Sequence, residues 1–260
     1  MTSTKSALIT GASMGLGSEF AKLAAKSGFN PILVARSQEK LEDLARELET
    51  QYKVEVTVIP LDLTSPTAPQ EILRRIEEKG SNVEILINNA GFGTSGPFDK
   101  SPLEKELGMV NLNISALVAL THLFIHHMKK QGHGRILNIA SAAGFQPGPN
   151  MAVYFATKAF VVSFSQAITH ELRDTGISVT AHCPGATATE FAKTADIQEA
   201  TLFKLTVAEK TAVATHGWKA MLKGKPLAIH GSINQLGVFL NRFSPRSLVV
   251  KVASQVTAKR

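Results

Sequence analysis

Cysteine is almost absent from this sequence of 260 residues, since Cys183 is the only one. A single cysteine excludes an internal disulfide and a cysteine metal cluster, and it favours the reducing cytoplasm as the location. Long apolar runs are absent as well, because no stretch approaches the roughly 18 uninterrupted apolar residues of a membrane-spanning helix. The apolar run Ala7–Ile9 near the N-terminus is too short for a signal peptide. We therefore expect a cytoplasmic protein without a metal site.

Acidic residues are absent from the last part of the sequence. From Gly217 to Arg260 there are eight Lys and Arg residues and no Asp or Glu. Such a segment can attract anionic lipid, an acidic carrier protein or a partner subunit, or it can be a solvated basic face. A nucleic-acid site is not indicated, because no stacking set of aromatic residues is interleaved with the basic ones.

The same C-terminal segment mixes apolar and basic residues between Ile233 and Val256. Gly237 and Pro245 interrupt it, so it is not expected to span a bilayer. The mixture suits a segment folded over a substrate pocket or subunit interface, or one that lies on an anionic membrane surface. We favour the first alternative, because the apolar residues are irregularly spaced.

Short apolar strands alternate with helical patterns along most of the chain. The predicted strands are Ser6–Thr10, Pro31–Ala35, Val54–Pro60, Ile85–Asn88, Arg135–Ala140, Ser178–His182 and Leu227–His230. The predicted helices are Leu16–Ser27, Gln38–Thr50, Pro66–Glu78, Pro102–Lys130, Met151–Thr175 and one that opens at Thr206–Glu209. Capping boxes are predicted at Ser101–Glu104 and Thr206–Glu209. This alternation predicts an α/β fold with a doubly wound, Rossmann-like parallel sheet of about seven strands and helices on both faces.

The pattern loosens after Pro184-Gly185. We expect residues 186–225 to contain a substrate loop or lid within a single domain that covers residues 1–260, because no linker or repeat divides the chain.

A glycine-rich turn follows the first predicted strand. Gly11, Gly15 and Gly17 stand between this strand and the next helix, with Ser13, Met14 and Leu16 between them. Glycines permit a tight turn there, and the helix N-terminus adds partial positive charge. The turn therefore predicts a site for the phosphates of a dinucleotide, although the spacing differs from G-x-G-x-x-G.

Arg36 follows the second predicted strand, where an acidic residue would favour free ribose hydroxyls. A guanidinium can instead pair with a 2′-phosphate. The position therefore favours NADP(H) over NAD(H) as the cofactor.

Tyr154 and Lys158 are separated by one helical turn, and Ser141 precedes Tyr154 by thirteen residues. Both side chains of the pair lie on one helix face. A nearby ammonium and an oxidised nicotinamide favour the phenolate, which would bring the pKa of Tyr154 from about 10 toward the working pH. Ser141 ends a strand, where its hydroxyl can hold a carbonyl oxygen. The three residues predict an acid/base site for hydride and proton transfer.

These motifs resemble those of the short-chain dehydrogenase/reductase family over nearly the whole chain. The matching segments are Thr10–Gly17, Asp62-Leu63, Asn88–Gly91, Asn113, Ser141, Tyr154 with Lys158, and Pro184-Gly185. The resemblance implies that Tyr154, Lys158, Ser141 and Asn113 are catalytic. Asn113 would bend the helix and bind a water in a proton relay to Lys158. Asn111 is a nearby alternative, but Asn113 stands in better register with Ala116 and Thr121.

The resemblance also implies which residues contact the cofactor. Asp62 and Leu63 would lie at the adenine, and Asn89, Ala90 and Gly91 at the adenosine ribose. Lys158 would hold the nicotinamide ribose, and the loop at Pro184, Gly185, Thr187 and Thr189 would contact the carboxamide. Family members are commonly dimers or tetramers built on the fourth and fifth helices, where Leu117, Val118, Phe160 and Val161 are candidate interface residues.

Substrate selection is expected from residues 142–150 and 186–205, with apolar walls from Phe92, Phe145, Phe191 and Phe203. These residues favour an apolar ketone, aldehyde or secondary alcohol as the small-molecule substrate. A 3-oxoacyl-carrier-protein reductase is the alternative enzyme, and a cofactor-binding scaffold without turnover is the alternative outside enzymes.

Overall fold

Seven parallel strands form the centre of the protein, in the order β3-β2-β1-β4-β5-β6-β7. The computed structural model describes residues 5–191 and 207–257. The strands are β1 Lys5–Thr10, β2 Asn30–Ala35, β3 Thr57–Pro60, β4 Asn82–Asn88, β5 Gly134–Ile139, β6 Ile177–Cys183 and β7 Leu227–Ile229. The order reverses between β1 and β4, as in a doubly wound fold. The predicted fold class is confirmed.

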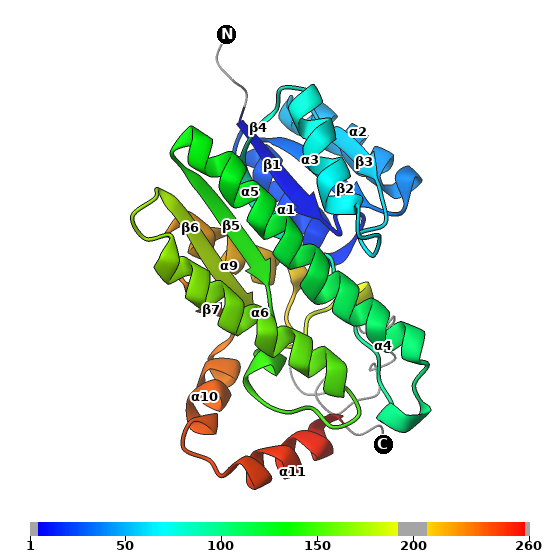
Figure 1. Cartoon of the computed structure of the whole chain (residues 1–260), viewed down its shortest axis with the longest axis vertical. Helices are drawn as coiled ribbons and strands as arrows, with labels where there is room; N and C mark the ends of the chain where they lie inside the picture. The colour runs from blue at the N-terminus through cyan, green and yellow to red at the C-terminus, as the bar shows by residue number, and fades with distance from the viewer. Residues whose placement is uncertain (1–4, 192–206, 258–260) are drawn as a thin grey trace.

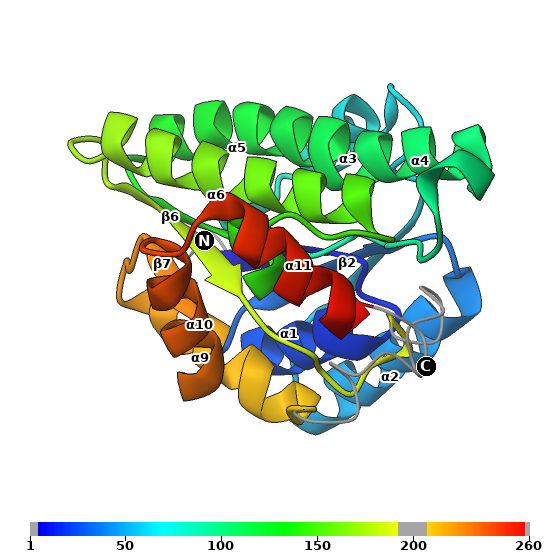
Figure 2. The same cartoon turned by 90° about the horizontal axis from the view of Figure 1, so that it is seen from below.

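Helices cover both faces of the sheet (Figures 1 and 2). One face is covered by α1 Gly15–Lys26, α2 Gln38–Tyr52 and α9 Lys210–Leu222. The other is covered by α3 Ala68–Glu78, α5 Leu117–Gln131 and α6 Ala152–Glu171. Successive strand side chains point to opposite faces of the sheet. Ile9 packs in the apolar core on the first face and Leu8 in the core on the second, and both side chains are fully buried.

The long fourth helix has a π turn in its middle. It runs as α4 Leu103–Val110, a π-helical segment Asn111–Ala116, and then α5. By length and composition alone, Leu103–Gln131 could cross a membrane. In the structure Leu120, Phe124 and Met128 are buried against the sheet, as in the core helix of a globular fold.

Several predicted boundaries and caps differ from the structure. The third strand is shorter than predicted, and the helix after Ser101 has Pro102 at its N-cap with no side-chain cap bond. Ser101 instead donates to Glu106, so its hydroxyl is not free to cap. The predicted capping box at Thr206–Glu209 is also wrong within the described residues, because Glu209 itself is the N-cap and makes no side-chain cap bond.

The predicted substrate segment 186–225 contains part of the core. Residues 192–206, with Phe203, lie outside the described residues. In α9, Val213, Ala214, Trp218 and Met221 are buried against α1 and the sheet. This part of the segment therefore packs on α1 and on strands β5, β6 and β7 as part of the core.

Two C-terminal helices that the sequence did not predict lie beyond the carboxyl edge of the sheet. They are α10 Ser232–Asn241 and α11 Arg246–Thr257, drawn in orange and red in Figure 1. Pro245 separates them, and in Figure 2, which is seen from below, α11 is drawn in front of the sheet, between α6 and α1.

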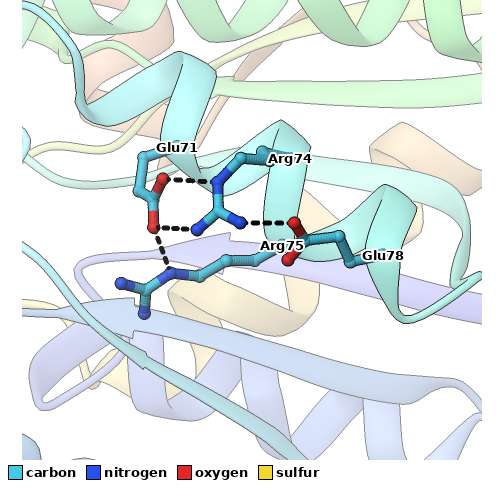
Figure 3. A network of polar contacts seen from close by, with 4 residues as sticks. All are labelled: Glu71, Arg74, Arg75 and Glu78. Atoms are coloured by element: carbon cyan, nitrogen blue, oxygen red, sulfur yellow. Dashed lines mark hydrogen bonds and ion pairs between the residues drawn. The ribbon is translucent and has the colours of Figure 1, made fainter.

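The exposed surface of α3 has a compact ion-pair network (Figure 3). Glu71 accepts hydrogen bonds from Arg74 and Arg75, and Arg74 also donates to Glu78. The hydrogen bond from Arg74 is the main cause that lowers the pKa of Glu71 to about 2. Exposed pairs of this kind contribute little to stability. Arg74 and Arg75 are therefore both paired with carboxylates of their own helix.

Candidate active site

The glycine turn between β1 and α1 is closely packed. Gly11 and Gly15 have φ values of 65° and 61°, in the left-handed region that favours glycine. A Cβ on Gly17 would lie 2.1 Å from the carbonyl oxygen of Gly11. The turn therefore requires these glycines, and it leaves its backbone open for phosphate groups.

Asn89 and Thr10 hold this turn on the sheet. The Asn89 amide donates to the carbonyl oxygens of Thr10 at 2.9 Å and Gly11 at 3.2 Å. The Thr10 hydroxyl accepts from the backbone N–H groups of Asn89 and Ala90 at 2.9 and 3.0 Å. These bonds join the ends of β1 and β4. The sequence did not single out the hydroxyl of Thr10, although the residue opens the matching segment.

The far end of the turn lies beside the end of β2. Ala12 N–H donates to the carbonyl oxygen of Val34 at 3.2 Å, which brings Ser13 toward Arg36. Arg36 is exposed and, within the described parts of the chain, forms no ion pair. Ser13 and Lys40 line the same shallow hollow at the start of α2. Lys40 is a second cation near this turn, and the sequence pattern did not single it out.

Asp62 and Leu63, which the resemblance assigns to the adenine, follow the end of β3. The Asp62 carboxylate accepts two hydrogen bonds of 2.9 Å from the N–H and hydroxyl of Thr64, and the residue is exposed. Leu63 is buried in the core under this edge. Asp62 is therefore held by its own turn at the rim of the sheet.

Tyr154 and Lys158 are both buried on one face of α6. Lys158 Nζ lies 5.8 Å from the centre of the Tyr154 ring and donates to the carbonyl oxygen of Ile139 at 2.8 Å. Burial raises the pKa of Tyr154 to about 12 and lowers that of Lys158 to about 8. The protein alone therefore does not lower the pKa of the phenol as the sequence analysis expected. Burial is the larger effect, and its size depends on tertiary packing.

Ser141 lies two residues beyond the end of β5, at the carboxyl edge of the sheet. Its hydroxyl accepts from the N–H of Ala143 at 3.1 Å. A hydrogen bond between Ser141 and Tyr154 lowers the pKa of the phenol, against the larger effect of burial. The structure thus brings Ser141, Tyr154 and Lys158 together.

Asn113 lies in the π turn and is buried, whereas its rival Asn111 is exposed. Its side chain accepts from Phe92 N–H at 3.1 Å and donates to Phe92 O at 2.9 Å and Thr157 Oγ1 at 3.1 Å. A Cβ on Gly91 would meet Asn113 Oδ1 at 2.9 Å and Lys158 Nζ at 3.7 Å. Asn113 therefore links the segment after β4 by hydrogen bonds to α6, the helix that carries Tyr154 and Lys158.

The loop after β6 closes the site from the opposite side. Thr187 donates to the carbonyl oxygen of Gly185 at 3.0 Å, and Pro184 O accepts from Ala142 N–H at 2.8 Å. A Cβ on Gly15 would lie 3.4 Å from the Thr189 side chain, which places Thr189 over the glycine turn. The loop therefore bridges the two halves of the predicted cofactor site.

An apolar wall stands next to Tyr154. Phe191 lies 5.3 Å from Tyr154 between ring centres, and Phe92 packs in the same cluster with Met109 and Met151. Phe145 packs instead with Leu117 and Val162 on another side of the helix. The structure thus brings Phe92 and Phe191 together beside Tyr154, while Phe145 belongs to a separate part of the core.

The C-terminal helices hold the loop after Ser141. Asn241 of α10 donates to Gln146 at 2.9 Å, and Thr257 of α11 donates to the carbonyl oxygen of Pro149 at 2.7 Å. Gly185 is covered by Asn234, whose amide would lie 2.3 Å from an added Cβ. The inner side of this segment therefore packs over the substrate side of the site. The sequence favoured a segment folded over a substrate pocket or subunit interface, but it did not indicate these particular partners, and the two hydrogen bonds join positions about a hundred residues apart.

The sheet and this site together define a dinucleotide-binding oxidoreductase. The family model for short chain dehydrogenases matches residues 5–200. The chain belongs to this family, and it is an oxidoreductase of a type that uses a nicotinamide cofactor.

Solved structures and curated relatives agree with this assignment. A short-chain dehydrogenase from Sphingobium yanoikuyae in complex with NADPH is 32% identical, with a TM-score of 0.80 over 92% of this chain and 94% of that one. The bulky-bulky ketone specific alcohol dehydrogenase from Comamonas testosteroni is 32% identical, with a TM-score of 0.78 over 93% of each chain. The very-long-chain 3-oxoacyl-CoA reductase-A of Danio rerio is 38% identical over 206 residues, which are 78% of this chain and 63% of the relative. This chain therefore spans less than two thirds of that relative's length.

Proposed function

We propose that this protein is an NADP(H)-dependent reductase of an apolar ketone, with 3-oxoacyl thioesters as the leading substrate class. The observation that carries the proposal is the buried pair of Tyr154 and Lys158 with the half-buried Ser141 beside Tyr154. The thioester class is supported by the resemblance to 3-oxoacyl-CoA reductases, and the apolar wall at Phe92 and Phe191 suits an alkyl or aryl ketone.

The residues present fit a nicotinamide dinucleotide phosphate. The glycine turn and the N-terminus of α1 suit a pyrophosphate, and Gly91 leaves room beside Lys158. Arg36 and Lys40 supply positive charge for a 2′-phosphate. Asp62 with Leu63 would hold the adenine, Asn89 and Ala90 would lie at its ribose, and Pro184 to Thr189 would border the nicotinamide.

The chain's own groups then perform the proton transfer. When bound, the reduced nicotinamide supplies the hydride to the carbonyl carbon. The Tyr154 phenol, protonated at neutral pH because burial raises its pKa to about 12, donates its proton to the carbonyl oxygen. Ser141 donates a hydrogen bond to the same oxygen, and the Lys158 ammonium stabilises the phenolate that forms.

Turnover of NADPH with a panel of carbonyl compounds tests this proposal. The panel contains a bulky aromatic ketone, a steroid ketone, a 3-oxoacyl-CoA and a 3-oxoacyl carrier protein. We expect ketone-dependent loss of NADPH absorbance, with Arg36→Ala weakening NADPH binding about 10–150-fold and leaving NADH binding nearly unchanged, because a charge-assisted hydrogen bond contributes roughly 1.5–3 kcal/mol.

Arg46→Ala is the matched control for this experiment, since Arg46 is exposed on α2, the helix that follows Arg36, and pairs with Asp43. If no carbonyl compound of the panel caused a loss of NADPH absorbance, the result would contradict the proposed reaction. Equal losses for NADPH and NADH in Arg36→Ala, or tighter binding of NADH by the wild type, would contradict the 2′-phosphate site.

We also propose that the protein is a dimer or tetramer built on α5 and α6. Of the predicted interface residues, Leu117 and Val161 are buried within the subunit, so they cannot meet a partner. Val118 lines a surface hollow with Ile114, and Phe160 is 38% exposed and stacked on Phe164. These surface residues support an interface across the two helices.

Light scattering at micromolar concentration checks the assembly. We expect an oligomer for the wild type and a monomer for Phe160→Arg, because a buried unpaired cation at an apolar interface is costly. Leu222→Arg, at a 43% exposed position on α9, should leave the mass unchanged. A monomeric wild type would refute the proposal.

A further inference from the structure

The outer side of α10 is a row of exposed apolar side chains. Ile233, Leu236, Phe239 and Leu240 are 69%, 58%, 54% and 51% exposed. At about 100° per residue they fall within an arc of about 120° on one face of the helix. The opposite face, with Asn234, Val238 and Asn241, contacts the subunit or is buried. The helix therefore points its apolar side away from the protein.

Exposed apolar side chains are also present in the following turn and on α11. Phe243 is 73% exposed and lies 5.2 Å from Phe239 between ring centres. Leu248 and Val252, one turn apart on α11, are each 51% exposed. We name the seven residues from Ile233 to Val252 on these outer sides the C-terminal apolar face: Ile233, Leu236, Phe239, Leu240, Phe243, Leu248 and Val252.

Cations without acidic partners accompany this face. Arg242, Arg246 and Lys251 are exposed, and none of them forms an ion pair within residues 5–191 and 207–257. No acidic residue follows Glu209 in the sequence. The face therefore combines exposed apolar groups with uncompensated positive charge.

We propose that the C-terminal apolar face docks on an anionic lipid surface. A membrane supplies an apolar layer for the leucines and phenylalanines and anionic headgroups for the cations. A second copy of the chain is a poorer occupant, because a twofold contact sets the same patch against itself and would bring Arg242, Arg246 and Lys251 close to their own copies with no acidic group between them. This inference does not depend on the substrate proposed above.

Docking in this way would place the site next to the lipid. The inner sides of the same helices contact Gln146, Pro149 and Gly185, which border the substrate side. A ketone dissolved in the bilayer would then be close to the loop after Ser141.

Sedimentation of the full chain with vesicles tests the proposal. The vesicles are phosphatidylglycerol mixed with phosphatidylcholine, or phosphatidylcholine alone. We expect wild-type protein to sediment with the anionic vesicles and much less with the neutral ones, and to be released at high salt. Arg242→Gln with Arg246→Gln should weaken binding about 25-fold, at about fivefold for each cation. Leu236→Gln with Phe239→Gln should weaken it at least about tenfold.

Phe98→Gln with Leu103→Gln is the matched control, because these two residues are 62% and 61% exposed elsewhere on the surface. It should bind vesicles like the wild type. All variants should keep the wild-type melting temperature and turnover of a water-soluble ketone, so that failure of the reaction and failure of docking are read separately.

Three outcomes would overturn the proposal. The first is wild-type protein that stays in the supernatant with anionic vesicles at low salt. The second is equal loss of binding in the control variant. The third is a change from dimer to monomer in Leu236→Gln with Phe239→Gln without vesicle binding by the wild type, which would assign the face to a second copy.

Discussion

Replacing Tyr154 by phenylalanine is expected to lower kcat at least about 100-fold, the usual scale for a general acid. The substitution removes the hydroxyl that donates the proton and keeps the ring that packs against Phe191 and Phe155. NADPH binding should therefore change little. Steady-state kinetics with the best carbonyl substrate, together with NADPH titration by fluorescence, measure the two effects separately.

Tyr52→Phe is the matched control, since Tyr52 is the other tyrosine of the chain and ends α2. It should turn over like the wild type. Reduction by the wild type should be flat below pH 8 and fall in the alkaline range, first as the Lys158 ammonium, with its pKa lowered to about 8, loses its proton and then as the Tyr154 phenol, with its pKa raised to about 12, does. Near-normal turnover in Tyr154→Phe would remove this residue from the mechanism.

Gly17→Ala is expected to weaken NADPH binding at least about 100-fold, because displacements of about 1 Å in a positioned site have effects of this size. The added Cβ would lie 2.1 Å from Gly11 O and 2.7 Å from Asn89 Nδ2. The first neighbour is backbone, so the glycine turn itself must move. We also expect a loss of about 1–3 kcal/mol in the free energy of unfolding, as for other overpacked sites.

Gly237→Ala provides the control for a methyl group added elsewhere. Gly237 lies within α10 and has no atom within 4 Å of an added Cβ. This variant should bind NADPH normally and gain up to about 1 kcal/mol from helix propensity. Calorimetry and NADPH titration on both variants give the comparison. Normal NADPH affinity in Gly17→Ala would show that the turn does not position the cofactor.

The parts of the site that depend on local spacing could be predicted from the sequence. Tyr154 and Lys158 share a helix face because they are four residues apart, and the glycine turn follows a strand with the apolar centre Ala7–Ile9. The direction of the pKa of Tyr154 could not be predicted, because it depends on how far packing around α6 excludes water. The hydroxyl of Thr10 and the cation of Lys40 were missed for a similar reason, since their positions depend on neighbouring strands and helices.

The C-terminal helices were missed because their pattern is the inverse of the usual one. An amphipathic helix is usually recognised in a sequence by the apolar face that it buries against the protein. In α10, Phe239 and Leu240 are exposed to solvent, whereas Asn241 contacts the protein. Pro245 also divides the segment into two short helices, so no single period runs through it. The apolar residues are therefore irregularly spaced in the sequence because they belong to two separate helices.

The π turn gives the long fourth helix two independent phases. A π turn holds one residue more than an α-helical path of the same rise, so side-chain directions after it are offset by about 100° from those before it. Before the offset, Met109 faces the apolar wall beside Tyr154, and after it Leu120 and Phe124 face the sheet. A single extra residue thus lets one continuous helix serve two differently oriented neighbours, with Asn113 at the point where the phase changes.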